Sequence, residues 1–359
     1  MVVTATSPGR VPGVDAVRAI AIAGVVAMNY HAYLNPRLAW RPLDPSLLER
    51  AINPMTGPLT TRFAATFVLV AGVGISLFTW GRDDLARRRI VLLRRGLLLY
   101  GAGAVLNWVW PGTILFFYGA YFMVAALICG WKTRRVIAVG AVSAVAAAAI
   151  ESWRTWRELG GYSTAWLSPK PDGPRNLMLR TLVDYTHPLL PWLAFLCIGI
   201  VIGRYLGTIV QWRSRVAVTA AAVLATVVVV RTVVRPDGDS DDAVLVRAAL
   251  STDPYDRGLL FTASAGATAL LAFLLVTAFV HRDGPLARAG RMSLSMYMGH
   301  VFFFHFFVDW LKVVPRESAT AALVLSAAYL APALSTAAWW SRVHGAGPVE
   351  RAYRTLGGG

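Results

Sequence analysis

The chain has 359 residues, of which 56% are hydrophobic and only 15% are charged. An ordinary soluble domain is about a quarter charged, so this composition excludes that class, and the mean hydropathy of +0.54 points to a membrane protein. The formal net charge of +16 would suggest a nucleic-acid partner in a soluble protein, but in a membrane protein basic residues chiefly set orientation. No nucleic-acid partner is therefore expected. Cys129 and Cys197 both lie inside apolar runs, which excludes a disulfide scaffold or a zinc finger.

Apolar segments long enough to cross a hydrocarbon core of ~30 Å occur repeatedly along the chain. Ten such segments lie near residues 14–34, 59–80, 93–110, 112–131, 135–151, 187–206, 214–234, 258–280, 291–311 and 319–340. Trp-Pro-Gly at 110–112 predicts a tight turn between the third and fourth segments. The sequence therefore predicts an all-α, polytopic membrane bundle of about ten transmembrane helices, with a single transmembrane domain over residues 14–340.

The distribution of charge predicts how the bundle is oriented. Lysine and arginine accumulate on the cytoplasmic side of membrane proteins. If the N-terminus is cytoplasmic, the inner segments carry most of the basic residues and the outer segments carry most of the acidic ones. We therefore expect a multi-pass protein of a bacterial-type plasma (inner) membrane, in contact with its lipids, with cytoplasmic tails at 1–13 and 341–359. The long outer loops are then residues 35–58, 152–186 and 235–257.

A dense group of arginines leads directly into the third span. Its members are Arg87, Arg88, Arg89, Arg94 and Arg95. Orientation and contact with anionic lipid explain such a group without any further role. The alternative is a binding site for an anionic cytosolic ligand, because guanidinium groups hold phosphate with fixed donors and a permanent charge.

Ionisable side chains inside a membrane are costly and mark candidate sites. The first span begins with Asp15 and Arg18, three residues apart and able to pair on one helix face, and it ends with Asn29 and His31. Histidine exchanges protons near neutrality, which makes His31 a candidate base. Residues two apart do not share a helix face, so both could reach one substrate only if the helix unwinds or one acts from the side. An interfacial histidine is the alternative interpretation.

Two later spans carry further candidates. Tyr297, His300 and His305 lie on the ninth span, where either histidine could simply bond to a neighbouring helix. Asp184 and His187 open the sixth span, and a carboxylate near a histidine is the base-plus-orienter arrangement of acyl-transfer sites.

The chain also resembles a known family. Three stretches resemble transmembrane acyltransferases related to heparan-α-glucosaminide N-acetyltransferase: 13–30, 67–73 and, most specifically, the Pro-Leu-Leu-Pro-Trp segment at 188–192 followed by Gly199 and Gly203. Near the C-terminus, residues 289–297 and 347–350 are similar to bacterial membrane proteins of unknown function. These motifs are short but cover nearly the whole chain.

This resemblance implies an enzyme that moves an acetyl or short acyl group from cytosolic acetyl-CoA to an amine or hydroxyl at the outer side of the membrane. The acceptor is expected to be a sugar, an envelope glycan or a small molecule, with no metal involved and with a homodimer as the expected assembly. In that family an asparagine late in the first helix and a later histidine form the catalytic pair. Asn29 matches the asparagine, whereas His31 follows it more closely than the family's histidine does.

The predicted catalytic residues are thus His31 as base and Asn29 as oxyanion donor, with Asp184 or His187 orienting the base or the acceptor. The predicted residues for binding acyl-CoA are Arg18, Arg87, Arg88, Arg89, Arg94, Arg95, Tyr297 and His300. The alternative function is a proton-coupled transporter or flippase of a lipid-linked or amphipathic molecule, using the same intramembrane histidines. A non-catalytic membrane scaffold is a third interpretation.

Overall fold

The computed structural model describes residues 11–35, 47–170 and 172–358, and within these ranges it is entirely helical without strands. The first ten residues of the predicted N-terminal tail and residues 36–46 of the first predicted loop lie outside this description. The described chain contains seven helices that are long and apolar enough to cross a membrane. An all-helical membrane protein, as predicted, is therefore confirmed.

Each of the ten predicted spans coincides with helical structure. The seven long helices are α1 (Pro12–Leu34), α4 (Arg62–Thr79), α5 (Leu85–Val109), α7 (Thr133–Leu159), α11 (Arg213–Val233), α13 (Leu259–Phe279) and α16 (Ala319–Val343). The other three predicted spans fall on the shorter apolar helices α6 (Leu115–Ile128) and α9 (Leu189–Arg204), and on α15 (Ser293–Phe304) continued by a π-helix, η2 (His305–Trp310). The number of spans that cross the bilayer, and the side on which the termini lie, stay predictions.

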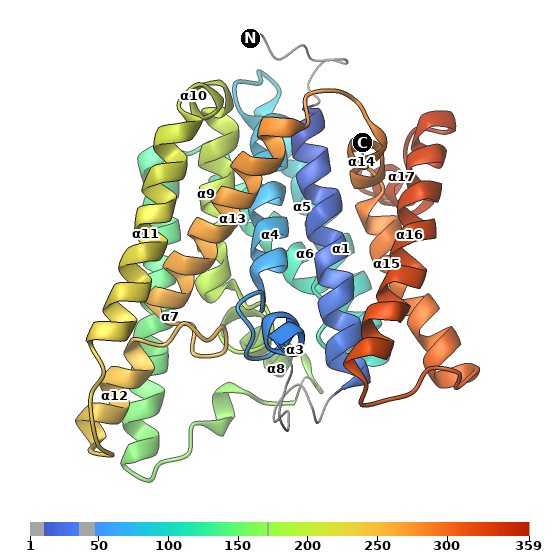
Figure 1. Cartoon of the computed structure of the whole chain (residues 1–359). Coiled ribbons are helices and arrows are strands. Elements are labelled where there is room, and N and C mark those ends of the chain that lie inside the picture. Colours follow the sequence, from blue (N-terminus) through green and yellow to red (C-terminus); the bar gives the residue numbers. More distant parts are fainter. Residues whose placement is uncertain (1–10, 36–46, 171, 359) are drawn as a thin grey trace. The chain divides into compact units, whose positions relative to one another are not determined.

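The chain divides into two compact units. The first comprises Met1–Phe67 and Ala272–Tyr353, and the second comprises Val68–Leu271 and Arg354–Gly359. The first unit holds α1, α3 (Leu47–Ile52), α14 (Pro285–Gly290), α15, η2, α16 and most of α17 (Pro348–Leu356). In it α1 packs against α14, α15 and α16, as Figure 1 shows.

Small residues allow helices of the first unit to approach closely. A Cβ atom on Gly290 of α14 would lie only 1.8 Å from the carbonyl oxygen of Asp15 in α1, so only glycine fits at this crossing.

Glu350 of α17 forms a second contact between helices of this unit. Its carboxylate accepts hydrogen bonds from the backbone N–H groups of Leu294 and Ser295, at 2.8 and 3.0 Å. A carboxylate is favourable at a helix N-terminus because it faces unpaired N–H groups and the positive end of the helix dipole. Glu350 thereby ties the C-terminal helix to α15.

The second unit holds α5 to α7, η1 (Ala165–Leu167), α8 (Pro174–Leu182), α9, α10 (Leu206–Gln211), α11 and α12 (Asp241–Ala249). Here α5 packs on α6 and α7 on α9. The predicted turn joins α5 to α6, with Gly112 at a φ of 85° that suits glycine. Helix α9 starts just after Pro188, as expected from a proline-rich helix start. Gly72 and Gly199 face each other's helix backbones so closely that neither position has room for a Cβ atom.

Helix α11 has the surface expected of a helix that faces lipid. Only 11% of its most apolar window is buried, and side chains such as Val218, Val228 and Val233 are exposed. Soluble monomers rarely expose a contiguous apolar surface of this extent. Exposed valines therefore support a membrane location independently of the hydropathy.

Candidate functional site

The histidine that meets Asn29 is His300, not His31. Asn29 lies on α1 and His300 on α15, both in the first unit, and Asn29 Nδ2 is 3.4 Å from His300 Nε2. The His300 side chain is fully buried. The two residues are 271 positions apart in sequence, so the packing of α15 on α1 creates this pair.

The surrounding bonds define the protonation of the His300 ring. Its Nδ1 atom is hydrogen-bonded to the carbonyl oxygen of Tyr297. Because a carbonyl oxygen can only accept, Nδ1 carries the ring proton, and in the neutral ring Nε2 then has the lone pair. The Asn29 amide N–H points at that lone pair. Tyr30 adds a further bond, donating its hydroxyl proton to the carbonyl oxygen of His300 over 2.7 Å.

Aromatic rings enclose this group, which we call the Asn29–His300 centre (Asn29, Tyr30, Tyr297 and His300). The rings of Tyr30 and His300 are stacked with centroids 5.9 Å apart, and Tyr297 lies 4.8 Å from His300. Tyr329 of α16 packs on Tyr30 at 6.2 Å. A buried, water-poor environment of this kind strengthens hydrogen bonds made to a developing charge.

His31 occupies another face of α1. The helix runs without interruption from Pro12 to Leu34, so the unwinding that would bring His31 beside Asn29 does not occur. Residues two apart are separated by about 200° around a helix. His31 is itself buried, with 5% of its surface exposed. Asn29 thus contacts His300 and shares no helix face with His31, and the predicted role of His31 as a base remains a prediction.

The predicted ion pair at the start of α1 is confirmed. Arg18 Nη1 lies 2.7 Å from Asp15 Oδ1, with both side chains partly buried. Arg18 therefore has an intramolecular partner, and its predicted contact with acyl-CoA remains a prediction. Tyr297, predicted to bind the same ligand, supplies the backbone carbonyl that fixes the His300 ring, and the predicted contacts of Tyr297 and His300 with acyl-CoA remain predictions.

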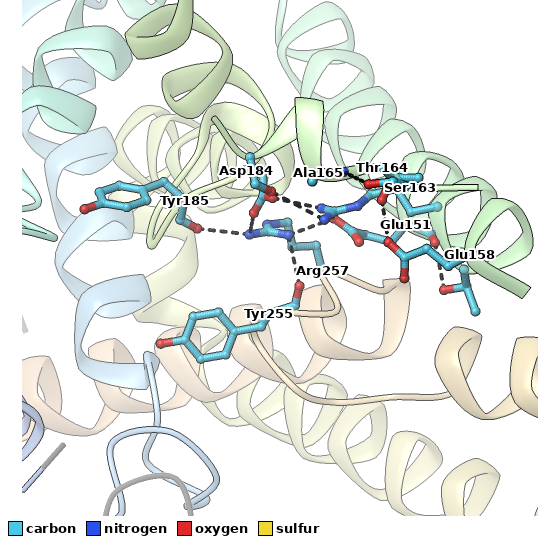
Figure 2. Close-up of polar contacts among 12 residues, drawn as sticks. Glu151, Glu158, Ser163, Thr164, Ala165, Asp184, Tyr185, Tyr255 and Arg257 are labelled. Atoms are coloured by element: carbon cyan, nitrogen blue, oxygen red, sulfur yellow. Dashed lines mark hydrogen bonds and ion pairs between the residues drawn. The ribbon is translucent and has the colours of Figure 1, made fainter. Parts of the chain in front are cut away.

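In the second unit, four charged side chains form what we call the ion cluster: Glu151, Arg154, Asp184 and Arg257 (Figure 2). Asp184, in the segment between α8 and α9, bonds Arg257 through Oδ1 and Arg154 through Oδ2, the latter at 2.9 Å. Arg257 Nη1 also lies 2.7 Å from Glu151 Oε1. Two carboxylates thus balance two guanidinium groups. Asp184 was predicted to orient a histidine, but here its partners are arginines.

Arg257 joins three segments of the second unit. It lies in the loop between α12 and α13, is 4% exposed, and has a φ of 47°, a left-handed conformation that is uncommon for a non-glycine residue. Its guanidinium donates to the carbonyl oxygens of Tyr185 at 3.1 Å and Tyr255 at 3.0 Å, as Figure 2 shows. Burial raises the pKa of the Tyr255 hydroxyl to about 12 and also raises the pKa of the nearby Asp253 carboxyl. Burial thus disfavours the charged forms of Asp253 and Tyr255 beside the cluster.

His187, three residues after Asp184, lies among aromatic rings. Its ring centroid is 4.5 Å from that of Trp192 and 5.9 Å from that of Phe117. The Tyr121 hydroxyl donates to its backbone carbonyl over 2.6 Å. His187 is therefore packed as part of an aromatic core at the start of α9, and its predicted catalytic role remains a prediction.

The five arginines predicted to bind phosphate differ in their surroundings on α5. Arg88 bonds Asp84 at 2.5 Å and the carbonyl oxygen of Phe78 at 2.8 Å. This bond from Arg88 lowers the pKa of the Asp84 carboxyl. Arg95 also lies over the Phe78 ring, at 5.4 Å. Arg88 and Arg95 thus pack against the end of α4.

Arg87 and Arg94 differ from those two because both are exposed. They are seven residues apart, so they lie on one face of α5. The half-buried Arg89 lies instead close to Gly130 at the end of α6, where its guanidinium would be 2.5 Å from a Cβ atom on that glycine. Arg87 and Arg94 are therefore the members of this group best placed to meet a ligand from solution.

Several polar contacts were not predicted. The carboxylate–histidine pair expected at Asp184 and His187 occurs instead at His305 and Asp309, whose Nδ1 and Oδ2 atoms are 2.6 Å apart. Their spacing of four residues on a helix is a signal that could have revealed this pair. The link from Arg257 to Asp184 spans 73 residues and has no comparable local signal.

Comparison with known families gives two matches that overlap in the middle of the chain. The family described as heparan-alpha-glucosaminide N-acetyltransferase, catalytic, matches residues 10–233. A family described as protein of unknown function (DUF418) matches residues 204–358. No curated protein matches the chain. Asn29 lies in the first matched region and His300 in the second, so each region contributes one residue of the Asn29–His300 centre.

Proposed function

Because the chain belongs to the family of heparan-alpha-glucosaminide N-acetyltransferase catalytic domains, a family of membrane acetyltransferases, we propose that it transfers an acetyl or short acyl group from acyl-CoA to an amine or hydroxyl. The donor is taken from the cytosol, and the acceptor, a sugar or envelope glycan, is modified at the outer side of the membrane. The observation that carries this proposal is the contact of Asn29 with the fully buried His300.

In the proposed reaction, Nε2 of His300 removes the proton from the acceptor as its nitrogen or oxygen attacks the thioester carbon. The carbonyl oxygen becomes an oxyanion, to which the Asn29 amide donates a hydrogen bond. Collapse of the intermediate forms the new C–N or C–O bond and breaks the C–S bond. The departing thiolate takes the proton from His300, so the ring returns to its starting state.

The geometry supports this division of roles. The base must reach the attacking nitrogen or oxygen and the oxyanion donor must reach the carbonyl oxygen of the same reaction centre, and the two side chains lie within 3.4 Å of each other. Hydrogen bonds in an unliganded catalytic site are often long and shorten around the substrate. A positioned general base contributes about 10²–10⁴-fold in rate, and one oxyanion donor about 10²–10³-fold.

The matched test compares two buried histidines of the same unit, His300 and His31. Membranes containing H300Q or H31Q are supplied with labelled acetyl-CoA, and acyl transfer to envelope material is measured. We expect H300Q to lose about 10²-fold or more of the transfer rate, and H31Q to lose far less, because His31 faces away from Asn29. A larger loss of transfer rate in H31Q than in H300Q would identify His31 as the base. Efflux driven by a pH gradient without any need for CoA would favour the transporter instead.

For the donor, the proposal assigns phosphate binding to Arg87 and Arg94, which are exposed on one face of α5. The double variant R87Q/R94Q should raise the apparent KM for acetyl-CoA while kcat changes little, since ground-state binding alone is weakened. R213Q/R215Q is the matched control, because it removes two arginines from the start of α11. An equal rise of KM in both variants would mean that only the overall charge matters.

A further inference from the structure

An apolar groove of about 570 Å³ runs along the end of α15, the π-helix η2 and α16, all in the first unit. Phenylalanines and a tryptophan form most of its walls. The lining residues are Gly299, Phe302, Phe303, His305, Phe306, Trp310 and Tyr329. Its volume falls in the range of small-molecule and cofactor sites.

A second pocket, of about 280 Å³, follows where η2 ends, and it is lined in part by Asp309, Lys312 and Arg316. A hydrogen bond joins a residue in the wall of the groove to a residue in the wall of the pocket. His305, in the wall of the groove, is bonded to Asp309 in the wall of the pocket, and Arg316 lies 2.6 Å from the other carboxylate oxygen of Asp309. One carboxylate therefore faces two permanently basic side chains, which leaves the pocket with a net positive charge.

The walls of the groove are suited to a membrane location. Phe302 is 69% exposed and Trp310 is 74% exposed, so large aromatic surfaces face outward from the protein. Tryptophan is enriched where the hydrocarbon meets the headgroups. An apolar groove next to a basic pocket at such a boundary has the polarity of an amphipathic anion, apolar at one end and negatively charged at the other.

We propose that this groove and pocket together bind one anionic phospholipid. Lys312 and Arg316 hold the phosphate, and one hydrocarbon chain lies along Phe302, Phe303 and Phe306. Basic side chains at a membrane surface attract anionic headgroups, and the concave aromatic wall distinguishes this site from the general lipid-facing surface. Lipid binding at this site requires no acyl transfer, so it can be tested independently of the proposed function.

The groove also adjoins the Asn29–His300 centre. Tyr329 lines the groove, donates its hydroxyl proton to the carbonyl oxygen of Met296 over 2.5 Å, and packs on Tyr30. A chain lying in the groove would therefore contact a ring that supports the centre. This places a lipid molecule one side chain away from the residues proposed to carry out the chemistry.

The experiment counts lipids on the intact protein. Full-length protein in nanodiscs made from equal amounts of phosphatidylglycerol and phosphatidylcholine with identical chains is analysed by native mass spectrometry. We expect one phosphatidylglycerol to be retained in preference to phosphatidylcholine, and K312Q/R316Q to lower that retention by roughly tenfold. R282Q/R342Q removes two exposed arginines elsewhere in the same unit and should retain the lipid like the unaltered protein.

Further variants and additions to the same experiment distinguish a phospholipid from other possible occupants of the groove. F302A/F306A, which removes two exposed rings, should weaken retention while the preference for phosphatidylglycerol persists. Equal retention of both lipids by the unaltered protein would overturn the proposal, as would an equal loss in R282Q/R342Q. Displacement of the lipid by inorganic phosphate alone would show a phosphate site without a chain site. A dimer that dissociates in F302A/F306A, whatever the lipid, would show that a second copy covers the groove.

Discussion

Two polar groups in this protein are built on opposite principles. The Asn29–His300 centre contains no Asp, Glu, Lys or Arg side chain. The Asn29 amide contacts the His300 imidazole, and the imidazole and the Tyr30 hydroxyl bond backbone carbonyl oxygens. The ion cluster contains four charges, and each is bonded to an opposite charge. Both are buried, and under the proposed function the uncharged group supplies the proton acceptor.

The difference follows from what burial does to each kind of group. A buried charge must be paired, and once paired its bonds are committed to its partners. Arg257 donates to two carboxylates and two backbone carbonyl oxygens. These bonds hold the loop between α12 and α13 against the segment around Tyr185. A neutral imidazole has no such requirement and can receive a proton. The ion cluster is therefore suited to holding segments together, and the Asn29–His300 centre to chemistry.

The largest effect should come from removing both members of the neutral pair. If Asn29 and His300 act in one step, N29A and H300Q each lower kcat by about 10²-fold or more. The N29A/H300Q double variant should then fall little below H300Q, because residues that act as a unit are not additive. Labelled acetyl transfer under saturating acetyl-CoA measures this. Fully additive losses of kcat would show that Asn29 and His300 act in separate steps, which would contradict the description of the centre as one catalytic unit.

The next effect concerns stability. R257Q leaves Asp184 and Glu151 to share the single guanidinium of Arg154, and removing one partner of a buried ion pair costs about 3–5 kcal/mol. Thermal unfolding in detergent should show a clear fall in Tm, whereas kcat per folded molecule should remain close to that of the unaltered protein. R247Q is the matched control, since Arg247 lies on the surface, where it bonds the exposed Asp239 at 3.5 Å and the backbone carbonyl oxygens of Pro236 and Gly238. A normal Tm with a lost kcat would make the ion cluster catalytic.

The smallest effect tests the loop beside the ion cluster. Burial raises the pKa of Asp253, so the folded protein binds this proton more tightly than the unfolded chain does. The stability contributed by the proton is therefore present at low pH and is lost as the pH rises toward and through the raised pKa. D253N keeps an oxygen that can accept from Tyr255 N. Its Tm should match that of the unaltered protein in acid and exceed it slightly at neutral pH, and a lower Tm at neutral pH would show that the charge is stabilising.

Much of the fold could be predicted because apolar length is a local property. Ten apolar stretches predicted ten helical regions, and the turn at Trp110–Gly112 and the helix start at Pro188 followed from proline and glycine alone. The shortness of α6 and α9 was less evident, because hydropathy windows extend through the turns that end those helices.

The site was harder to predict because it depends on which helices touch. Asn29 could be singled out as a polar residue in an apolar helix, and the lack of a shared face with His31 was already visible from the spacing. The sequence offered no way to choose His300 over other membrane histidines, since that contact depends on the packing of α15 against α1. Likewise, Asp184 was identified from its nearness to His187, whereas its partner Arg257 comes from a distant loop.

The separation of Asn29 from His300 has a consequence for how such chains are recognised. A fragment trimmed to the boundaries of the matched acetyltransferase region, residues 10–233, would contain the amide but not the imidazole. Under the proposed function, the region of undefined function supplies the other half of the catalytic pair. Classifying proteins of this design by either half alone would miss the proposed pair, because neither stretch of sequence holds both groups.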